Sequence, residues 1–89
     1  MLAVAYAHQF KKDWKRLKAS GTNLSPVKDV MQRIQREERL SAIYDDHPLH
    51  GRLKGHRCCH PLGDVPLIYF VSSGTVTFER IGSHSELFE

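Results

Sequence analysis

Residues 65–81 read VPLIYFVSSGTVTFERI, and this stretch decides the fold. Its central part, Leu67–Val71, is apolar throughout, as expected of a strand in the middle of a sheet where water reaches neither face. The serines and the glycine that follow suit a short hairpin loop. The stretch therefore predicts two antiparallel strands, Val65–Val71 and Thr75–Ile81.

A third strand is predicted just before this hairpin. Residues Arg52–His60 form another short run of β type, and Pro61–Asp64 is short enough for a second hairpin loop. Three strands joined in this way form an antiparallel meander. Strict alternation along Arg52–His60 predicts one polar, basic face, which carries Arg52, Lys54, His56, Cys58 and His60.

Two amphipathic helices are predicted in the first half of the chain. The first covers residues 7–20 and is stopped by Gly21. The second has an N-cap residue, Ser25, and a first-turn proline, Pro26, and extends to about Arg39. Apolar residues recur at helical spacing in both, namely Phe10, Trp14 and Leu17 in the first and Val27, Val30, Met31 and Ile34 in the second. Both stripes are expected to form core against the sheet.

With Leu2–Tyr6 as a short first strand, the order becomes β-α-α-β-β-β. This is an α+β fold, a small antiparallel sheet with two N-terminal helices packed on it. A chain of 89 residues supports one compact core, so a single domain over residues 1–89 is expected. Ser83–Glu86 has capping-box spacing, which predicts a final helical turn with Leu87 and Phe88 folded back.

Lys and Arg outnumber Asp and Glu by 13 to 10, and the basic residues cluster at 11–18 and 52–57. Two such clusters suit a phosphate backbone, although a lysine-rich stretch is also an ordinary solvated helix face. No apolar run approaches the roughly 20 residues that span a bilayer, and the start of the chain lacks a signal-peptide pattern. A cytoplasmic protein with no membrane partner is expected. Cys58 and Cys59 are adjacent, which predicts free thiols.

Five of the six histidines lie in the second half, at His47, His50, His56, His60 and His84. RNA is cut without a metal ion when a base removes the 2′-hydroxyl proton, an acid protonates the leaving 5′-oxygen and a cation stabilises the charge on phosphorus. Imidazole serves as either base or acid near neutral pH, and Arg80 offers a planar fork to phosphate oxygens. This chemistry needs no metal or cofactor. A zinc site built from His56, Cys58 and His60 is an alternative, although the paired CxxC spacing is absent.

The second half resembles the YafQ type of bacterial toxin, within the RelE/ParE toxin–antitoxin superfamily. The matching residues keep their order and nearly their spacing; they are Asp46-His47-Pro48-Leu49, Gly51, Lys54-Gly55, Arg57, His60, Asp64, Leu67-Ile68-Tyr69, Phe78-Glu79-Arg80, Gly82, His84 and Leu87-Phe88. The first half shares only the strand-helix-helix plan and the basic first helix. The resemblance implies a RelE-like fold and a ribosome-dependent endoribonuclease that cleaves messenger RNA in the decoding site. It also implies a cognate antitoxin, whose complex with the toxin binds operator DNA.

The resemblance also suggests a role for each matching residue. It assigns proton transfer to His84 or His60, the phosphate clamp to Arg80, and substrate positioning or assistance to His47 and Asp64. Which histidine is the base is left open. Substrate binding is expected from Phe88, Lys54, Arg52 and Arg57. Two positions depart from the pattern: Cys58 replaces an acid that these toxins usually carry two residues before the histidine, and alternation turns Arg57 away from the catalytic strip.

Two other functions are compatible with the expected fold, since a fold does not fix a function. A ParE-like toxin inhibits a topoisomerase by binding alone, and a nucleic-acid-binding module contacts phosphates without cutting. The set of His47, His60, Arg80 and His84 favours the nuclease, because a pure binder has no need of it. An acidic or amphipathic antitoxin segment that crosses the active cleft is expected to complement the basic clusters.

Overall fold

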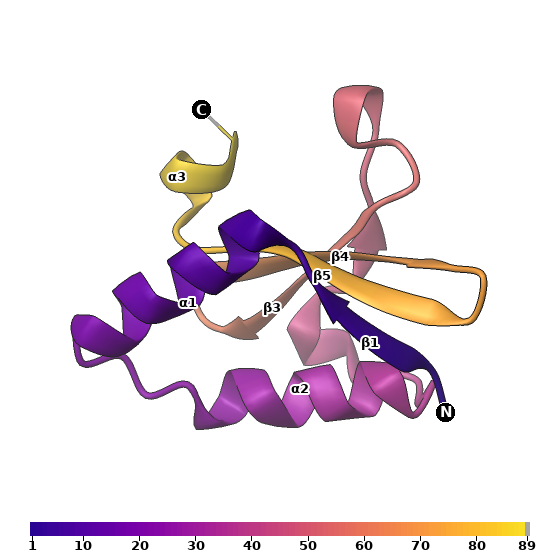
Figure 1. Cartoon of the computed structure of the whole chain (residues 1–89), viewed down its shortest axis with the longest axis horizontal. Coiled ribbons are helices and arrows are strands. Elements are labelled where there is room, and N and C mark those ends of the chain that lie inside the picture. Colours follow the sequence, from indigo (N-terminus) through magenta and orange to yellow (C-terminus); the bar gives the residue numbers. More distant parts are fainter. Residues whose placement is uncertain (89) are drawn as a thin grey trace.

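The computed structural model describes residues 1–88 and confirms the α+β fold (Figure 1). Its strands are β1 (Ala3–Tyr6), β2 (His47–Pro48), β3 (Arg57–Leu62), β4 (Val65–Ser72) and β5 (Thr75–Ile81). Its helices are α1 (His8–Ala19), α2 (Ser25–Gln35) and the short α3 (His84–Phe88). Two 3₁₀ turns, η1 (Ala42–Tyr44) and η2 (Gly51–Leu53), flank β2. No helix within residues 1–88 is long and apolar enough to cross a membrane.

The sheet has the strand order β1-β5-β4-β3-β2. Strands β3, β4 and β5 form the predicted antiparallel meander. Strand β1, however, pairs with β5 in parallel, with Ala3 opposite Thr75 and Tyr6 opposite Phe78. The sheet is therefore mixed, whereas the sequence predicted an antiparallel one. Two parallel strands need a long crossover connection between them. The two helices and three strands between β1 and β5 provide one.

The strand predicted over Arg52–His60 is shorter than expected. Gly51 and Gly55 adopt left-handed backbone angles, with φ of +67° and +93°, so the chain turns twice before extended structure begins at Arg57. Glycine adopts such angles without a steric penalty. The polar strip predicted along one face of this segment is therefore wrong, because Arg52 and Lys54 lie in a loop.

The ends of α2 also differ from the prediction. Leu24 occupies the N-cap position, and Ser25, predicted as the cap, is the first helical residue, whose backbone N–H donates to Asn23 Oδ1 at 3.1 Å. The helix ends at Gln35 and not near Arg39. Just beyond the end, Glu37 has a φ of +61°, a left-handed angle that stops a helix.

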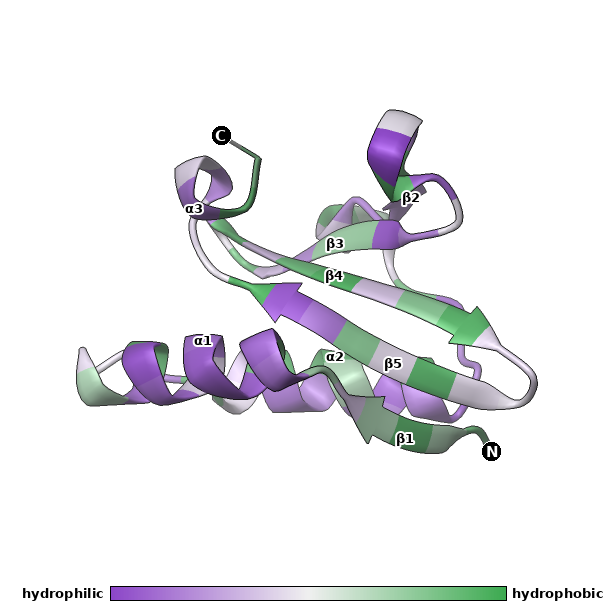
Figure 2. Cartoon of the chain, turned by 45° about the horizontal axis from the view of Figure 1, so that its top comes forward, coloured by the Kyte–Doolittle hydropathy of each residue, from purple (hydrophilic) through white to green (hydrophobic). Residues whose placement is uncertain are grey.

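The core lies between the two long helices and one face of the sheet. Figure 2 shows α1 and α2 on that side, while η2, β2 and α3 lie on the other. The buried core residues are Leu2, Phe10, Leu24, Val27, Val30, Ile34, Cys59, Leu67, Tyr69, Val76, Phe78 and Ile81. Burying each large apolar side chain contributes about 1.5–3 kcal/mol. The two long helices thus cover one face, and the opposite face, called the open face below, is flanked only by η2, β2 and the short helix α3.

Candidate active site

A row of side chains crosses the open face from β2 to β5. His47 is paired with Cys58, Cys58 with Ile68, and Ile68 with Arg80. Residues directly opposite on neighbouring strands project to the same side of a sheet. His47 and Arg80, which lie 33 positions apart in the chain, therefore stand on the same face, at the two ends of one row.

Arg80 reaches this face because of a β-bulge. Ile68 pairs with Arg80 and the next residue, Tyr69, pairs with Phe78, so Glu79 is an extra residue on β5. A bulge of this kind reverses the alternation for the residues after it. Phe78 and Ile81 can both enter the core as a result, while Arg80 points to the open face. Bulges are common next to active sites because they redirect a side chain in this way.

The imidazoles of His47 and His60 lie side by side. Their ring centroids are 6.2 Å apart, and their planes are inclined by only 18°. Asp45, whose backbone is left-handed (φ 50°), lies near both imidazoles. Its carboxylate Oδ2 lies 3.8 Å from Nδ1 of His47 and 3.7 Å from Nδ1 of His60. The pair therefore has an acid beside it, although position 58 carries a cysteine.

The two imidazoles differ in their hydrogen bonds. Nδ1 of His47 contacts the backbone carbonyl of Asp45 at 2.6 Å, and since a carbonyl only accepts, this nitrogen carries the proton. Nε2 of a neutral His47 is then left as a proton acceptor. Nδ1 of His60 is buried without a hydrogen-bond partner within residues 1–88. Protonated His60 would gain an ion pair with Asp45.

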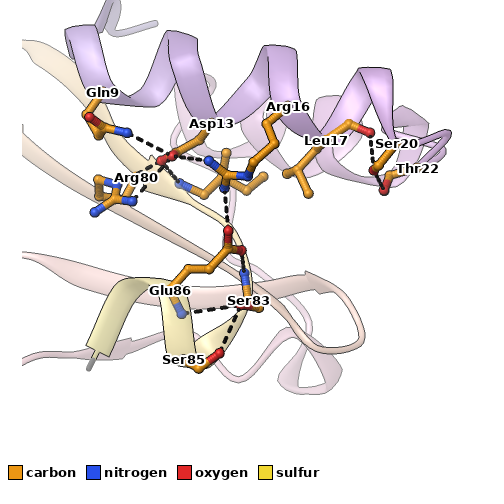
Figure 3. A network of polar contacts seen from close by, with 11 residues as sticks. Gln9, Asp13, Arg16, Leu17, Ser20, Thr22, Arg80, Ser83, Ser85 and Glu86 are labelled. Atoms are coloured by element: carbon orange, nitrogen blue, oxygen red, sulfur yellow. Dashed lines mark hydrogen bonds and ion pairs between the residues drawn. The ribbon is translucent and has the colours of Figure 1, made fainter.

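Arg80 is anchored by Asp13 of α1, a residue that sequence reasoning missed (Figure 3). Nε of Arg80 donates to Asp13 Oδ2 at 2.7 Å and Nη2 donates to Oδ1 at 3.3 Å. Burial would raise the pKa of the Asp13 carboxyl, but hydrogen bonds from Arg80, Gln9 and the Ile81 backbone outweigh it and hold that pKa below its usual value. The same pairing raises the pKa of Arg80, which therefore stays cationic.

Helix α3 and η2 border a cleft of about 420 Å³. Its lining residues are His50, Arg52, Leu53, Leu87 and Phe88. The predicted capping box closes α3: the Ser83 backbone N–H donates to Glu86 Oε1 at 2.8 Å, and the Glu86 N–H donates to Ser83 Oγ at 3.3 Å. On this short helix the His84 and Phe88 rings pack with centroids 4.7 Å apart. The terminal aromatic thus lies beside an imidazole at the edge of the cleft.

The other predicted site residues are dispersed. Asp64 lies exposed in the turn between β3 and β4. Lys54 is exposed in the loop after η2. Arg57 lies on the helix side, as alternation predicted, and its Nε is 3.3 Å from the Asp46 carboxylate, which also accepts from the Tyr69 hydroxyl at 2.7 Å. Arg57 therefore has a structural partner and does not face the open side.

The zinc site considered above does not form. Within residues 1–88, no group of three or more His, Cys, Asp or Glu side chains is placed to hold a metal ion. His56 packs edge-on against Phe70 with ring centroids 4.9 Å apart, and Cys58 is buried within the row. That hypothesis depended on a continuous strand over residues 52–60, which the two left-handed glycines prevent.

Comparisons with known proteins identify relatives of this chain by sequence and by fold. The family described as "Bacterial toxin of type II toxin-antitoxin system, YafQ" matches residues 2–89. The mRNA interferase toxin YafQ of Escherichia coli K12 is 36% identical over 86 residues, covering 96% of this chain and 94% of that protein. A copper-bound mutant toxin from Helicobacter pylori has a TM-score of 0.95 at 36% identity, with 99% of this chain and 100% of that chain covered. A chain of the E. coli DinJ-YafQ complex has a TM-score of 0.90 at 34% identity, with both chains fully covered.

Fold, site and matches together define the chain as a toxin of the type II toxin–antitoxin class. Its helices cover one sheet face, and the opposite face carries the histidine pair and the anchored arginine. Within this class the chain belongs to the YafQ family, whose pattern it matches over residues 2–89. The resemblance drawn from the second half of the sequence is thereby confirmed.

Proposed function

We propose that this chain is an mRNA interferase, an endoribonuclease that cuts translated messenger RNA in the ribosomal decoding site and so arrests translation. The observation that carries the proposal is the His47–His60 pair on the same open face as the anchored Arg80. The name of the E. coli relative, an mRNA interferase toxin, supports the same activity. Inhibition of a topoisomerase by binding alone would not require two imidazoles and a fixed cation on one face.

In this proposal His47, for which the sequence suggested a role in substrate positioning or assistance, is instead the general base. Its Nδ1–H is held by the Asp45 carbonyl, so the lone pair of Nε2 is available to remove the proton of the RNA 2′-hydroxyl. The 2′-oxygen then attacks phosphorus, and the bond from phosphorus to the 5′-oxygen breaks. A positioned base of this type contributes about 10²- to 10⁴-fold in rate.

The other groups act on the phosphate and on the leaving oxygen. Arg80 stabilises the negative charge that develops on the phosphate oxygens, with a guanidinium already fixed by Asp13. His84 on α3 supplies the proton to the 5′-oxygen, and protonated His60, beside the Asp45 carboxylate, is the alternative acid. Asp64 assists from the turn between β3 and β4.

The cleft between η2 and α3 suits single-stranded RNA. Phe88 lines it and is 38% exposed, so it can stack on a base, and Arg52 lines the opposite side and can contact a phosphate. Lys54 adds a second cation in the loop that follows. Arg57, predicted as a further binding residue, acts indirectly in this proposal, by fixing Asp46 and the start of β3.

We also infer a cognate antitoxin as partner. The relative from E. coli is found in a complex named DinJ-YafQ, and the net charge of +3 on this chain favours an acidic segment. An antitoxin segment laid over the open face would exclude RNA from the histidine pair. Binding of operator DNA by the toxin–antitoxin complex and a cytoplasmic location complete the proposal.

The test compares the wild-type chain with His84→Ala during induced expression in a bacterial host. Wild type is expected to arrest growth and to produce new 5′ ends within translated reading frames. His84→Ala is expected to slow cleavage by about 10²- to 10⁴-fold, with folding intact because His84 is exposed and lies outside the core. His8→Ala is the matched control, since His8 is an exposed histidine at the start of α1.

The outcomes separate the competing functions. Growth arrest without RNA cuts would overturn the nuclease and favour topoisomerase inhibition, which a plasmid supercoiling assay would then detect. A His84→Ala chain that cuts as fast as wild type would remove His84 from the mechanism and leave His60 as the acid.

A further inference from the structure

Asp13 is a charged residue with no exposed surface. Its side chain is 0% exposed, and within residues 1–88 no other polar or charged residue is among the buried ones of the core. Its two carboxylate oxygens accept hydrogen bonds from Gln9 and Arg16 on its own helix and from Arg80 and the Ile81 backbone on β5 (Figure 3). Burying a carboxylate costs free energy that only such pairing offsets, so the charge must have a use.

Part of that use is to complete the edge of β5. Strand β1 pairs with β5 only as far as Phe78, where the chain turns into α1. On the β1 side, the backbone N–H of Ile81 therefore has no strand partner, and it donates to Asp13 Oδ2 at 3.2 Å. A neutral asparagine oxygen would accept this bond equally well. Completing the strand edge thus accounts for a polar side chain at position 13 but not for its charge.

The charge is explained by Arg80. Its guanidinium is held at Nε and Nη2 in a two-point contact with the carboxylate, which leaves three of its five N–H donors unused by Asp13. The Arg80 side chain is 30% exposed and stands at the end of the row that begins with His47. A forked contact fixes the plane of a guanidinium as well as its position, which a single bond does not.

The same carboxylate is connected to the helix that carries His84. Arg16 lies 3.2 Å from Asp13 Oδ1 through Nη1 and 3.1 Å from Glu86 Oε2 through Nη2. Glu86 in turn caps α3 through the Ser83 backbone. At Gly82 an added Cβ would lie 3.1 Å from Glu86 Oε1 and 3.2 Å from Arg16 Nη2, so the connection passes close to the backbone there.

We propose that Asp13 is a positioning residue, which holds Arg80 in the orientation that meets the phosphate before RNA binds. Asp13 itself touches no substrate and acts through Arg80. The proposal rests on the function proposed above, since it assigns Arg80 to the scissile phosphate. Fixing a cation in advance lowers the reorganisation that the reaction would otherwise require.

The test uses Asp13→Asn, which keeps the shape and an acceptor for Ile81 but removes the charge. Asp29→Asn is the control, because Asp29 pairs with Arg33 in an exposed contact on α2. Asp13→Asn is expected to slow single-turnover RNA cleavage by about 10²-fold, and Asp29→Asn to leave it unchanged. In an Arg80→Ala background, Asp13→Asn should cause no further loss, as expected of residues that act as one unit. Equal losses in both backgrounds, or full cleavage by Asp13→Asn, would overturn the proposal.

A second measurement does not depend on activity. In wild type the Nε–H of Arg80 should exchange with water slowly by NMR, compared with that of the exposed Arg39. Asp13→Asn should accelerate this exchange by about tenfold or more, because a charge-assisted hydrogen bond is replaced by a neutral one. Rapid exchange of the Arg80 Nε–H in wild type would overturn the proposal even if the variant did not fold. Slow exchange in a wild-type chain that cuts no RNA would instead retain the anchoring and refute the proposed function.

Discussion

Cys58 lies at the middle of the row on the open face, between His47 and Ile68. Burial, and then the nearby Asp45 and Asp46, raise the pKa of its thiol to about 11. The group is therefore protonated at neutral pH and is neither a base nor a ready nucleophile. A thiol cannot replace the acid that YafQ-type toxins usually carry at this position. The carboxylate closest to the two imidazoles is instead that of Asp45, from the segment before β2.

The raised pKa of the Cys58 thiol predicts that the protein loses stability at alkaline pH. Burial also raises the pKa of Cys59 and of Tyr69. The folded state then holds protons that the unfolded state releases, so stability is complete below the ordinary cysteine value of 9.0 and falls as the pH rises toward about 11. For Cys58 alone the loss reaches about 2 kcal/mol. Urea unfolding midpoints at pH 7.5, 9 and 10.5 measure it.

The control for this prediction is Cys58→Ala. Its midpoint should fall less steeply with pH than that of wild type, because one of the three buried acids is gone. A wild-type midpoint that is constant from pH 7.5 to 10.5 would contradict the burial of these groups.

At the scale of residues, the sequence pointed to candidate catalytic groups but not to the groups that hold them. His47, His60 and Arg80 could be named because their types and order match a known pattern. Asp13 could not, since its partner Arg80 lies 67 positions away and the bulge at Glu79 that brings them together leaves no local signal. One hint was present: Asp13 follows Phe10 by three positions and precedes Trp14, so it occupies the apolar stripe of α1.

Among the elements, those with a long and regular pattern were predicted within a few residues. Strands β4 and β5 and helix α1 follow directly from apolar runs and periodicity. The segment from β2 to β3 was predicted incorrectly. Its course depends on left-handed angles at Gly51 and Gly55, which cannot be recognised from its β-type composition. The parallel pairing of β1 was missed for another reason: a strand of four residues contains too little pattern to identify its neighbour.

Gly55 provides the prediction at this scale. Its φ of +93° is strained for any residue with a side chain, although the space around an added Cβ is open. Gly55→Ala should therefore lower the free energy of unfolding by about 1–2 kcal/mol through backbone strain alone. Denaturant titration measures this. Unchanged stability of Gly55→Ala would show that the turn before β3 does not require a glycine.

For the molecule as a whole, one aromatic cluster joins the sheet to the helices. Phe78 of β5 is 1% exposed and lies 5.9 Å from Phe10 of α1, 6.0 Å from Tyr6 of β1 and 6.4 Å from Tyr69 of β4, measured between ring centroids. Strand β1 and helix α1 come from the start of the chain, and strands β4 and β5 come from its second half. Their packing around one ring is what makes the sheet and α1 a common core.

Phe78→Ala should cost about 3–5 kcal/mol, the range for removing a buried phenylalanine. A small domain has a total stability of about 5–15 kcal/mol, so the variant should unfold at a much lower temperature. Val71→Ala is the control, since Val71 is 51% exposed on β4 and its loss should change stability by about 0.5 kcal/mol or less. Thermal unfolding followed by circular dichroism compares the two. Equal melting temperatures would show that the cluster around Phe78 is not the centre of the core.

The parallel pair of β1 and β5 also joins two segments that a ribosome makes at different times. Ribosomes make β1 early and β5 late, yet the two strands are neighbours, and the core on their helix side requires both. Contacts between such distant segments form only after the intervening chain is available. Arg80 and His84 belong to the same late segment. The nascent chain therefore cannot complete this core or present Arg80 and His84 until β5 and α3 have been made, so we expect toxicity to begin only after that point.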